Sequence, residues 1–223
     1  MIEGRRRGRF ITFEGPDGSG KSTQAERLAA VLRADGLDVV LTREPGGTPL
    51  GERVRAVLLD RDAAGRHSPR ADALLFSAAR AQHVDDVIEP ALVRGAVVVC
   101  DRYADSTAAY QGYGSGLSLD ELRRLEAFAT RGLRPDLVIL LDLSVTAGMG
   151  RRLAGEPGSV NRFESPDAFD AAFHERVRAG FLALAAADPE RWRVVDADRP
   201  ADEIAQDVVA LVRAFLRSVP ERR

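Results

Sequence analysis

The residues best suited to do chemistry lie near the N-terminus, where Gly15–Ser22 reads Gly-Pro-Asp-Gly-Ser-Gly-Lys-Ser. The run matches the pattern G-x-x-x-x-G-K-[ST], in which backbone N–H groups surround phosphate groups, the lysine reaches the β- and γ-phosphates and the hydroxyl ligates Mg²⁺. Lys21 is also the only lysine of the chain, so a compact ammonium is kept at this position alone. The pattern predicts a nucleotide triphosphate site, with Lys21 as a catalytic residue and Ser22 as a metal ligand.

The flanking residues supply the context that this loop requires. Phe10–Phe13 is apolar and β-branched, which predicts a buried strand, and Thr23–Leu32 has the apolar spacing of a helix. A glycine-rich turn that fits by chance is the alternative, and it would not need these flanking elements. The predicted ATP-binding residues of the loop are Gly15, Pro16, Asp17, Gly18, Ser19, Gly20, Lys21, Ser22 and Thr23.

Asp101 ends the apolar run Val97–Cys100 and is followed by Arg102. A carboxylate that closes a buried strand is typical of the Walker B position, which holds Mg²⁺ directly or through water. The alternative is an aspartate that caps the next turn. A neighbouring guanidinium can bind a phosphoryl group through two hydrogen bonds. The pair therefore favours phosphoryl transfer over simple nucleotide binding, with Asp101 as a metal ligand and Arg102 as a catalytic residue.

Strand-like runs alternate with helical runs, which predicts an α/β fold with a doubly wound, parallel, five-stranded sheet and helices on both faces. Ligands of such folds bind at the carboxyl ends of the strands. The phosphate loop, Arg43–Gly47 and Asp101–Tyr103 each follow a predicted strand, so we expect them to meet at one edge. Strands are predicted over 9–14, 38–43, 96–101, 136–142 and 191–196, and helices over 21–34, 50–59, 71–94, 106–111, 119–131, 145–153, 166–187 and 201–216.

Composition limits the classes of protein that the chain can be. The 223 residues carry a formal net charge of −2, which provides no general attraction to nucleic acid or to an anionic membrane. The single cysteine, Cys100, permits no internal disulfide, and no apolar run approaches the roughly 20 residues of a membrane span. We expect a cytoplasmic protein with one domain over 9–218, preceded by a basic, tag-like segment over 1–8.

Several motifs together resemble those of bacterial thymidylate kinases, in the same order and at similar spacing. They are Phe13–Thr23, Thr42–Thr48, Leu74–His83, Asp101–Tyr103, Ser106–Thr107, Ala109–Gly112 and Arg134–Leu137. The similarity covers most of residues 9–200. It implies a P-loop kinase fold with a short lid, and transfer of a phosphoryl group from ATP to dTMP, with Mg²⁺, to give dTDP for dTTP synthesis.

The resemblance also implies a role for each matching residue of the acceptor site. Asp17 would face the sugar 3′-hydroxyl, and Tyr110 would lie against C2′ and disfavour ribose. Phe76 would stack on thymine and Arg80 would hydrogen-bond its carbonyl edge, and their i, i+4 spacing places both on one helix face. Phe76 could instead pack in the core, and Arg55 could be an exposed helical arginine. The implied dTMP-binding residues are Asp17, Arg43, Glu44, Pro45, Arg55, Phe76, Arg80, Arg102, Ser106, Tyr110 and Gln111, with a cis peptide bond between Glu44 and Pro45.

Residues 151–164 are predicted to form the lid, because the cluster Gly155, Pro157, Gly158 and Ser159 favours a mobile segment and Arg151, Arg152 and Arg162 supply charge. The phosphate loop contains no arginine before its lysine, so charge on the transferring phosphoryl group must be neutralised from elsewhere. The resemblance implies that the lid does this through Arg152 and Arg162. Arg151 is predicted to pack against adenine, and Glu164 is predicted as a metal ligand.

Other functions stay open at this point. A kinase for another nucleoside monophosphate would use the same loop, and a nucleic-acid-dependent ATPase could use Arg5–Arg7, although the near-neutral charge argues against it. A GTPase is excluded because its Asn-Lys-x-Asp motif needs a second lysine. Asn161 departs from the family pattern, which has aspartate there. We expect a homodimer built on the apolar side of 71–94, with no nucleic-acid or membrane partner.

Overall fold

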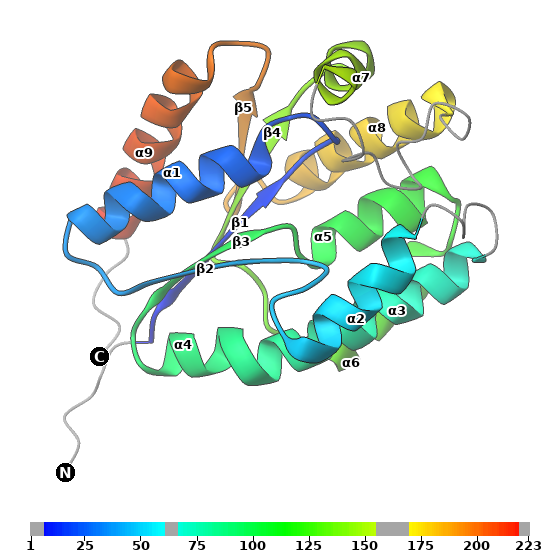
Figure 1. Ribbon diagram of the computed structural model, residues 1–223, viewed down its shortest axis with the longest axis horizontal. Coiled ribbons are helices and arrows are strands. Elements are labelled where there is room, and N and C mark those ends of the chain that lie inside the picture. Colours follow the sequence, from blue (N-terminus) through cyan, green and yellow to red (C-terminus); the bar gives the residue numbers. More distant parts are fainter. Residues whose placement is uncertain (1–6, 61–66, 155–169, 219–223) are drawn as a thin grey trace.

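The computed structural model describes residues 7–60, 67–154 and 170–218, and it confirms the predicted α/β fold. Five parallel strands form one sheet in the order β2-β3-β1-β4-β5 (Figure 1). The chain runs from β1 outwards to β2, returns through β3 and then crosses to β4 on the other side of β1, so the winding reverses around β1. The strands are β1 (Arg9–Glu14), β2 (Val39–Arg43), β3 (Val97–Asp101), β4 (Leu137–Asp142) and β5 (Trp192–Asp196).

Helices cover both faces of the sheet (Figure 1). They are α1 (Lys21–Ala34), α2 (Pro49–Leu59), α3 (Pro69–His83), η2 (Val84–Ile88), α4 (Glu89–Val93), α5 (Ala104–Thr107), η3 (Ala108–Gly114), α6 (Leu119–Thr130), α7 (Val145–Leu153), α8 (Ala171–Ala187) and α9 (Ala201–Ser218). One face packs against α1 and α9, which lie side by side. The other face packs against η2, α4, η3 and α8. Both faces are therefore buried, as the continuous apolar strands require.

Strand β4 shows how this two-sided burial arises from the sequence. Leu137, Ile139 and Leu141 pack into the core beneath α1 and α9, whereas Val138 and Leu140 pack beneath α8. Successive side chains of a strand point to opposite faces. An unbroken apolar run therefore fills two cores at once.

The helices differ from the predictions in two places. Where the sequence predicts one helix over 71–94, α3 passes into a π-helical segment, η2, and then into α4. Where it predicts a helix over 106–111, the short α5 leads into a second π-helical segment, η3. Such segments wind with i→i+5 hydrogen bonds and are frequent at functional sites. The predicted start of α8 and most of the predicted lid, 155–164, lie outside the described residues.

The backbone is closely packed at the residue directly before β1. Gly8 is buried, and its N–H donates to the carbonyl of Leu92 at 2.7 Å. A Cβ at Gly8 would lie 1.8 Å from the carbonyl oxygen of Ala96, so this close approach requires glycine.

The register of the sheet brings the predicted site segments together. Asp101 pairs with Phe13 of β1 and with Arg43 of β2, so the carboxyl ends of three strands lie level at one edge. The phosphate loop and the residues after β2 and β3 therefore start from the same edge, as expected. None of the described helices is long and apolar enough to cross a membrane.

Candidate active site

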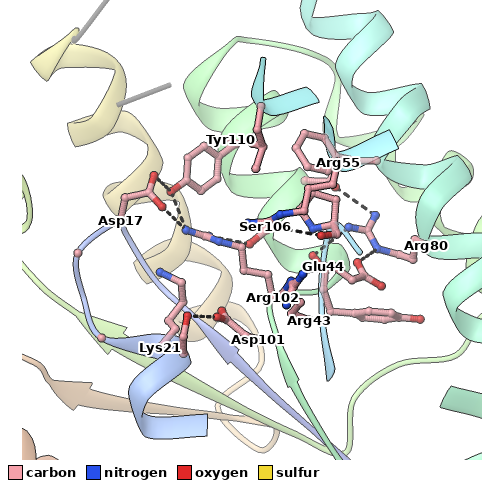
Figure 2. A pocket seen from close by; sticks show the side chains of 18 of the residues that line it. Asp17, Lys21, Arg43, Glu44, Arg55, Arg80, Asp101, Arg102, Ser106 and Tyr110 are labelled. Atoms are coloured by element: carbon pink, nitrogen blue, oxygen red, sulfur yellow. Dashed lines mark hydrogen bonds and ion pairs between the residues drawn. The ribbon is translucent and has the colours of Figure 1, made fainter. Parts of the chain in front are cut away.

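A cleft of about 510 Å³ opens at this edge of the sheet (Figure 2). Gly15, Pro16 and Ser19 belong to the phosphate loop without lining the cleft, and Arg162 and Glu164 lie outside the described residues. The predicted site residues that line the cleft are Asp17, Gly18, Gly20, Lys21, Ser22, Thr23, Arg43, Glu44, Pro45, Arg55, Phe76, Arg80, Asp101, Arg102, Ser106, Tyr110, Gln111, Arg151 and Arg152.

Glycines give the phosphate loop its shape. Gly15 and Gly18 have φ values of 139° and 80°, which side chains rarely adopt. A Cβ at Gly15 would lie 2.4 Å from the carbonyl oxygen of Leu141, and one at Gly18 would lie 2.4 Å from that of Gly148. Gly20 caps the N-terminus of α1, whose first N–H groups and partial positive charge favour an anion.

Lys21 is the first residue of α1 and is buried. Its Nζ donates across the loop to the carbonyl of Pro16 at 2.7 Å. Burial, with the nearby charge of Arg102, lowers the pKa of Lys21 to about 8. Phosphate groups in the loop would favour the protonated form, because opposite charges stabilise each other.

Ser22 and Asp101 bring two oxygen atoms together from α1 and the end of β3. The Ser22 hydroxyl donates to Oδ2 of Asp101. The other carboxylate oxygen, Oδ1, is buried and has no hydrogen-bond partner among the described residues. An unpaired buried carboxylate oxygen beside a hydroxyl fits Mg²⁺, which binds through few protein oxygens and keeps water or phosphate as its other ligands. Consistently, no cluster of three metal-ligating His, Cys, Asp or Glu side chains occurs within 7–60, 67–154 and 170–218.

Arg102 joins the phosphate loop to the segment that follows β3 (Figure 2). Its guanidinium donates to Oδ1 of Asp17 and, at 3.1 Å, to Oγ of Ser106. The guanidinium carbon also lies 5.1 Å from the ring centroid of Tyr110. Tyr110 completes the cluster, because its hydroxyl donates to Oδ2 of Asp17 at 2.8 Å.

These contacts determine the charge of Asp17. Burial by itself would raise the pKa of this carboxyl, but the charges of Arg102 and Lys21 and the hydrogen bond from Tyr110 lower it to about 2. Asp17 is therefore ionised at physiological pH and acts only as a hydrogen-bond acceptor. A substrate hydroxyl near it would be bound as a donor.

Arg80, only 1% exposed, is held by two carboxylates. Its Nε donates to Oε2 of Glu44 at 2.7 Å, and a terminal nitrogen lies 2.6 Å from Oε2 of Glu126. The same nitrogen donates to the Thr107 hydroxyl at 3.1 Å, and the other donates to the carbonyl of Tyr103 at 3.2 Å. Three of the five N–H donors of the guanidinium are thus hydrogen-bonded, to Glu44, Thr107 and Tyr103, and the side chain also lines the cleft.

Three partners in this network were not predicted from the sequence: Glu126, Thr107 and His83. His83 lies on α3 at i+3 from Arg80, and that spacing could have pointed to it. The ring of His83 contacts Oε1 of Glu44 at 2.9 Å. Glu126 comes from α6, and no local pattern signals its pairing with α3.

Arg43 and Arg55 approach the cleft from the end of β2 and from α2 (Figure 2). Arg43 donates to both oxygens of Glu52, at 3.1 and 3.2 Å. Arg55 donates to the carbonyl of Pro45 at 2.9 Å, and the peptide bond before Pro45 is cis, as the resemblance implies. Burial, with the charge of Arg43, lowers the pKa of Arg55. Arg55 is half-buried, so the alternative that it is merely an exposed arginine on a helix is wrong.

The remaining cleft residues form its far wall. Phe76 on α3 is half-buried and lines the cleft, so it is not packed in the core. Tyr110 and Gln111 are neighbours on η3, and both line the cleft. Gln111 is 3% exposed, and its carboxamide makes no hydrogen bond to the residues that the structure describes. A buried amide without a protein partner is suited to a polar ligand.

Arg151 and Arg152 line the cleft from the last turn of α7. Arg151 donates to the carbonyl of Ala197 at 2.9 Å and lies 3.5 Å from a carboxylate oxygen of Asp198. It therefore links α7 to the segment after β5.

Comparison with known proteins agrees with this geometry. A family model described as thymidylate kinase matches residues 13–208. A thymidylate kinase of Roseiflexus castenholzii is 49% identical over 220 residues, covering 95% of this chain and 96% of the relative. One of Deinococcus radiodurans is 54% identical over 205 residues, covering 92% and 96%. The crystal structure of thymidylate kinase from Ehrlichia chaffeensis aligns with a TM-score of 0.73 at 33% identity, over 92% of this chain and 99% of that one. With a match over most of its length, the chain belongs to the thymidylate kinase family.

Proposed function

We propose that the cleft phosphorylates dTMP with ATP bound on the side of the phosphate loop and dTMP bound on the side of α3 and η3. The chain is a kinase that converts dTMP to dTDP. One observation supports this assignment of ATP and dTMP to the two sides of the cleft. A single cleft joins the phosphate loop around Lys21 to an arginine-rich pocket that includes Arg80 and Arg102. A kinase needs two anionic substrates side by side, and this cleft offers positive charge to both.

The donor half would hold the triphosphate of ATP. Backbone N–H groups of Gly15–Thr23 would surround the phosphates, and Lys21 would bridge the β- and γ-phosphates. Ser22 and Asp101 would hold Mg²⁺, which supplies positive charge to the phosphate oxygens when bound. Arg151, beside the segment after β5, would pack against adenine.

The acceptor half would hold the sugar and phosphate of dTMP. Asp17 is an ionised acceptor that fits the 3′-hydroxyl, and the ring of Tyr110 beside it would occupy the space that a 2′-hydroxyl needs. Arg43, Arg55 and Arg102 would bind the acceptor phosphate, with Ser106 supporting Arg102.

The base would be read by hydrogen-bonding pattern. The edge of thymine presents an acceptor, a donor and an acceptor. Arg80 offers N–H donors only, and the Gln111 amide offers an acceptor and a donor, so together they would complement this edge. Cytosine would place its amino group against the donor-only Arg80, and the pocket would reject it. Phe76 would stack on the ring, and Glu44 and Pro45 would form the opposite wall.

Catalysis in this arrangement needs no covalent intermediate. An oxygen of the acceptor phosphate, already an anion, attacks the γ-phosphorus while the bond to the β–γ bridging oxygen breaks and ADP leaves. The protein aligns the two anions and neutralises charge on the transferring group. Lys21 and Arg102 lie on either side of that position, and Arg152, with Arg162 and Glu164 of the lid, would complete the positive charge and the metal site.

The experiment is to measure ADP release with dTMP, dUMP, UMP, dCMP and dGMP as acceptors. We expect dTMP to give the highest kcat/KM, with dUMP next and dCMP at the background rate. A higher value for UMP or dCMP than for dTMP would show that the acceptor half has been assigned to the wrong base.

A cytoplasmic homodimer without nucleic-acid or membrane partners completes the proposal. The support is apolar exposure on two helices that pack together, since Leu74 of α3 is 54% exposed and Phe128 of α6 is 86% exposed. Burying such side chains against a second copy would be favourable. Light scattering should give about twice the 24.2 kDa of the chain, and Phe128→Asp should shift it to the monomer value.

A further inference from the structure

Glu14 is a buried carboxyl that the assignments above leave without a role. It is the last residue of β1, fully buried, and it lies directly before the phosphate loop. Its Oε1 accepts the backbone N–H of Tyr103 at 2.8 Å, and its Oε2 accepts the hydroxyl of Ser106 at 2.6 Å. Both donors follow β3, so Glu14 joins β1 to the segment that carries Arg102.

Arg102 needs support because its backbone is strained. Its φ of 72° is a left-handed conformation that side chains rarely adopt and that persists only where neighbours hold it. Two consecutive N–H groups hold it here, because that of Arg102 donates to the carbonyl of Phe13 at 3.0 Å and that of Tyr103 donates to Glu14. The turn directs the guanidinium back to Asp17.

The same carboxylate orients the hydroxyl that receives Arg102. When Glu14 is ionised, both of its oxygens accept, and the single hydroxyl proton of Ser106 is donated to it. The lone pairs of Ser106 are thereby left to accept from the guanidinium of Arg102 at 3.1 Å. Glu14 therefore acts on Arg102 at two places, the backbone and the side chain.

Packing alone does not explain a carboxyl at this position. Burial, together with the charge of Asp105, raises the pKa of Glu14 to about 8, although Ser106, Arg102 and the N–H of Tyr103 lower it. A carboxyl kept where its ionised form is disfavoured is more typical of functional sites than of cores.

We propose that Glu14 is a positioning residue for phosphoryl transfer, whose carboxyl holds the strained turn and the Ser106 hydroxyl so that Arg102 faces the acceptor phosphate. The role rests on the assignment of Arg102 to that phosphate. Glu14 itself touches no substrate. Its loss should therefore change the use of dTMP and leave the use of ATP unchanged.

The test compares Glu14→Leu and Glu14→Gln with a matched control, Thr12→Val. Thr12 is fully buried on the same face of β1, and its hydroxyl has no partner in the described part of the chain, so Thr12→Val should behave as wild type. We expect Glu14→Leu to lower kcat/KM for dTMP by about 100-fold with the KM of ATP within about twofold. Glu14→Gln keeps one oxygen for Tyr103 and should lose only about fivefold to tenfold. If Glu14→Leu does not fold, Glu14→Gln tests the proposal in the same way: kcat/KM for dTMP should fall while the KM of ATP stays unchanged.

A double-mutant cycle with Arg102→Ala, read as the dTMP dissociation constant by calorimetry, tests the route of the effect. If Glu14 acts through Arg102, its substitution should change dTMP affinity by less than about twofold once Arg102 is absent. If the losses of dTMP affinity in the two single variants instead multiply in the double variant, the proposal is overturned. A folded Glu14→Leu variant that uses dTMP at the wild-type rate would also overturn it. Failure of the proposed function would show separately, as a wild-type protein without dTMP kinase activity.

Discussion

Nδ1 of His83 lies 2.9 Å from Oε1 of Glu44, the carboxylate whose other oxygen accepts from Nε of Arg80. A carboxylate can only accept, so Nδ1 of His83 carries a proton and donates it. On its other side, Nε2 of His83 lies 2.7 Å from the hydroxyl of Thr42. The imidazole therefore fixes the carboxylate that orients Arg80, the arginine proposed to contact the base.

His83→Leu should raise the KM of dTMP by about tenfold and leave that of ATP nearly unchanged, because a buried carboxylate loses a hydrogen bond. His83→Asn, whose amide can donate from near the place of Nδ1, should recover most of the loss. Steady-state kinetics on both variants, with thermal unfolding as a control for folding, makes the measurement. Equal losses in the two variants would contradict a role for the donated proton.

ATP binding should take up protons near pH 8 and not near pH 6. The pKa of Lys21 is about 8 in the free protein, so about half of the amines are neutral at that pH, and phosphates raise the pKa by favouring the ammonium. Well below the pKa the ammonium is already formed and no proton is needed. Calorimetry in two buffers of different ionisation enthalpy measures the uptake. Lys21→Arg stays protonated and should abolish it; an undiminished uptake would place the titrating group elsewhere.

Substitutions at Tyr110 should separate its ring from its hydroxyl. Tyr110→Ala removes bulk near C2′ and should raise the UMP-to-dUMP ratio of kcat/KM by about tenfold. Tyr110→Phe keeps the ring and loses the two hydrogen bonds of the hydroxyl, to Asp17 and from Arg102, so it should keep the wild-type ratio while weakening both acceptors. Parallel measurements with the two acceptors decide this. Relaxed discrimination in Tyr110→Phe would assign sugar selection to the hydroxyl.

The lid arginines should affect the rate and not the binding of either substrate. Arg162→Ala, and to a lesser degree Arg152→Ala, should lower kcat by about 10³-fold with little change in either KM, because a cation on the transferring phosphoryl group acts in the transition state. Rapid-quench measurement of a single turnover separates this step from product release. Near-normal single-turnover rates in both variants would leave Arg102 as the catalytic cation.

Much of the fold and of the donor half could be predicted because the signals are local. Gly15–Ser22 is a continuous run whose glycines are needed by the turn itself, and the five strands are apolar runs that end at Gly, Pro or polar residues. Asp101 was recognisable because it closes such a run. In these cases one stretch of sequence determines both the conformation and the chemistry.

The residues that position the arginines of the acceptor half could not be predicted, because their contacts join segments that are distant in the sequence. Glu126 contacts Arg80 from another helix, and Glu14 contacts Ser106 from another strand. Neither pairing has a periodicity that reveals it. The left-handed backbone of Arg102 is likewise invisible, since nothing in the identity of an arginine indicates a positive φ.

The π-helical segment η3 has a consequence for how the chain tolerates changes in length. Its i→i+5 turns hold one residue more than α-helical turns, so deleting one residue within Ala108–Gly114 would let the backbone close as an ordinary α-helix. A deletion on either side of Tyr110 and Gln111 would also rotate this pair by about 100° relative to the residues across the deletion, which would change how the two side chains face the cleft. A shortened chain would therefore fold and lose its substrate.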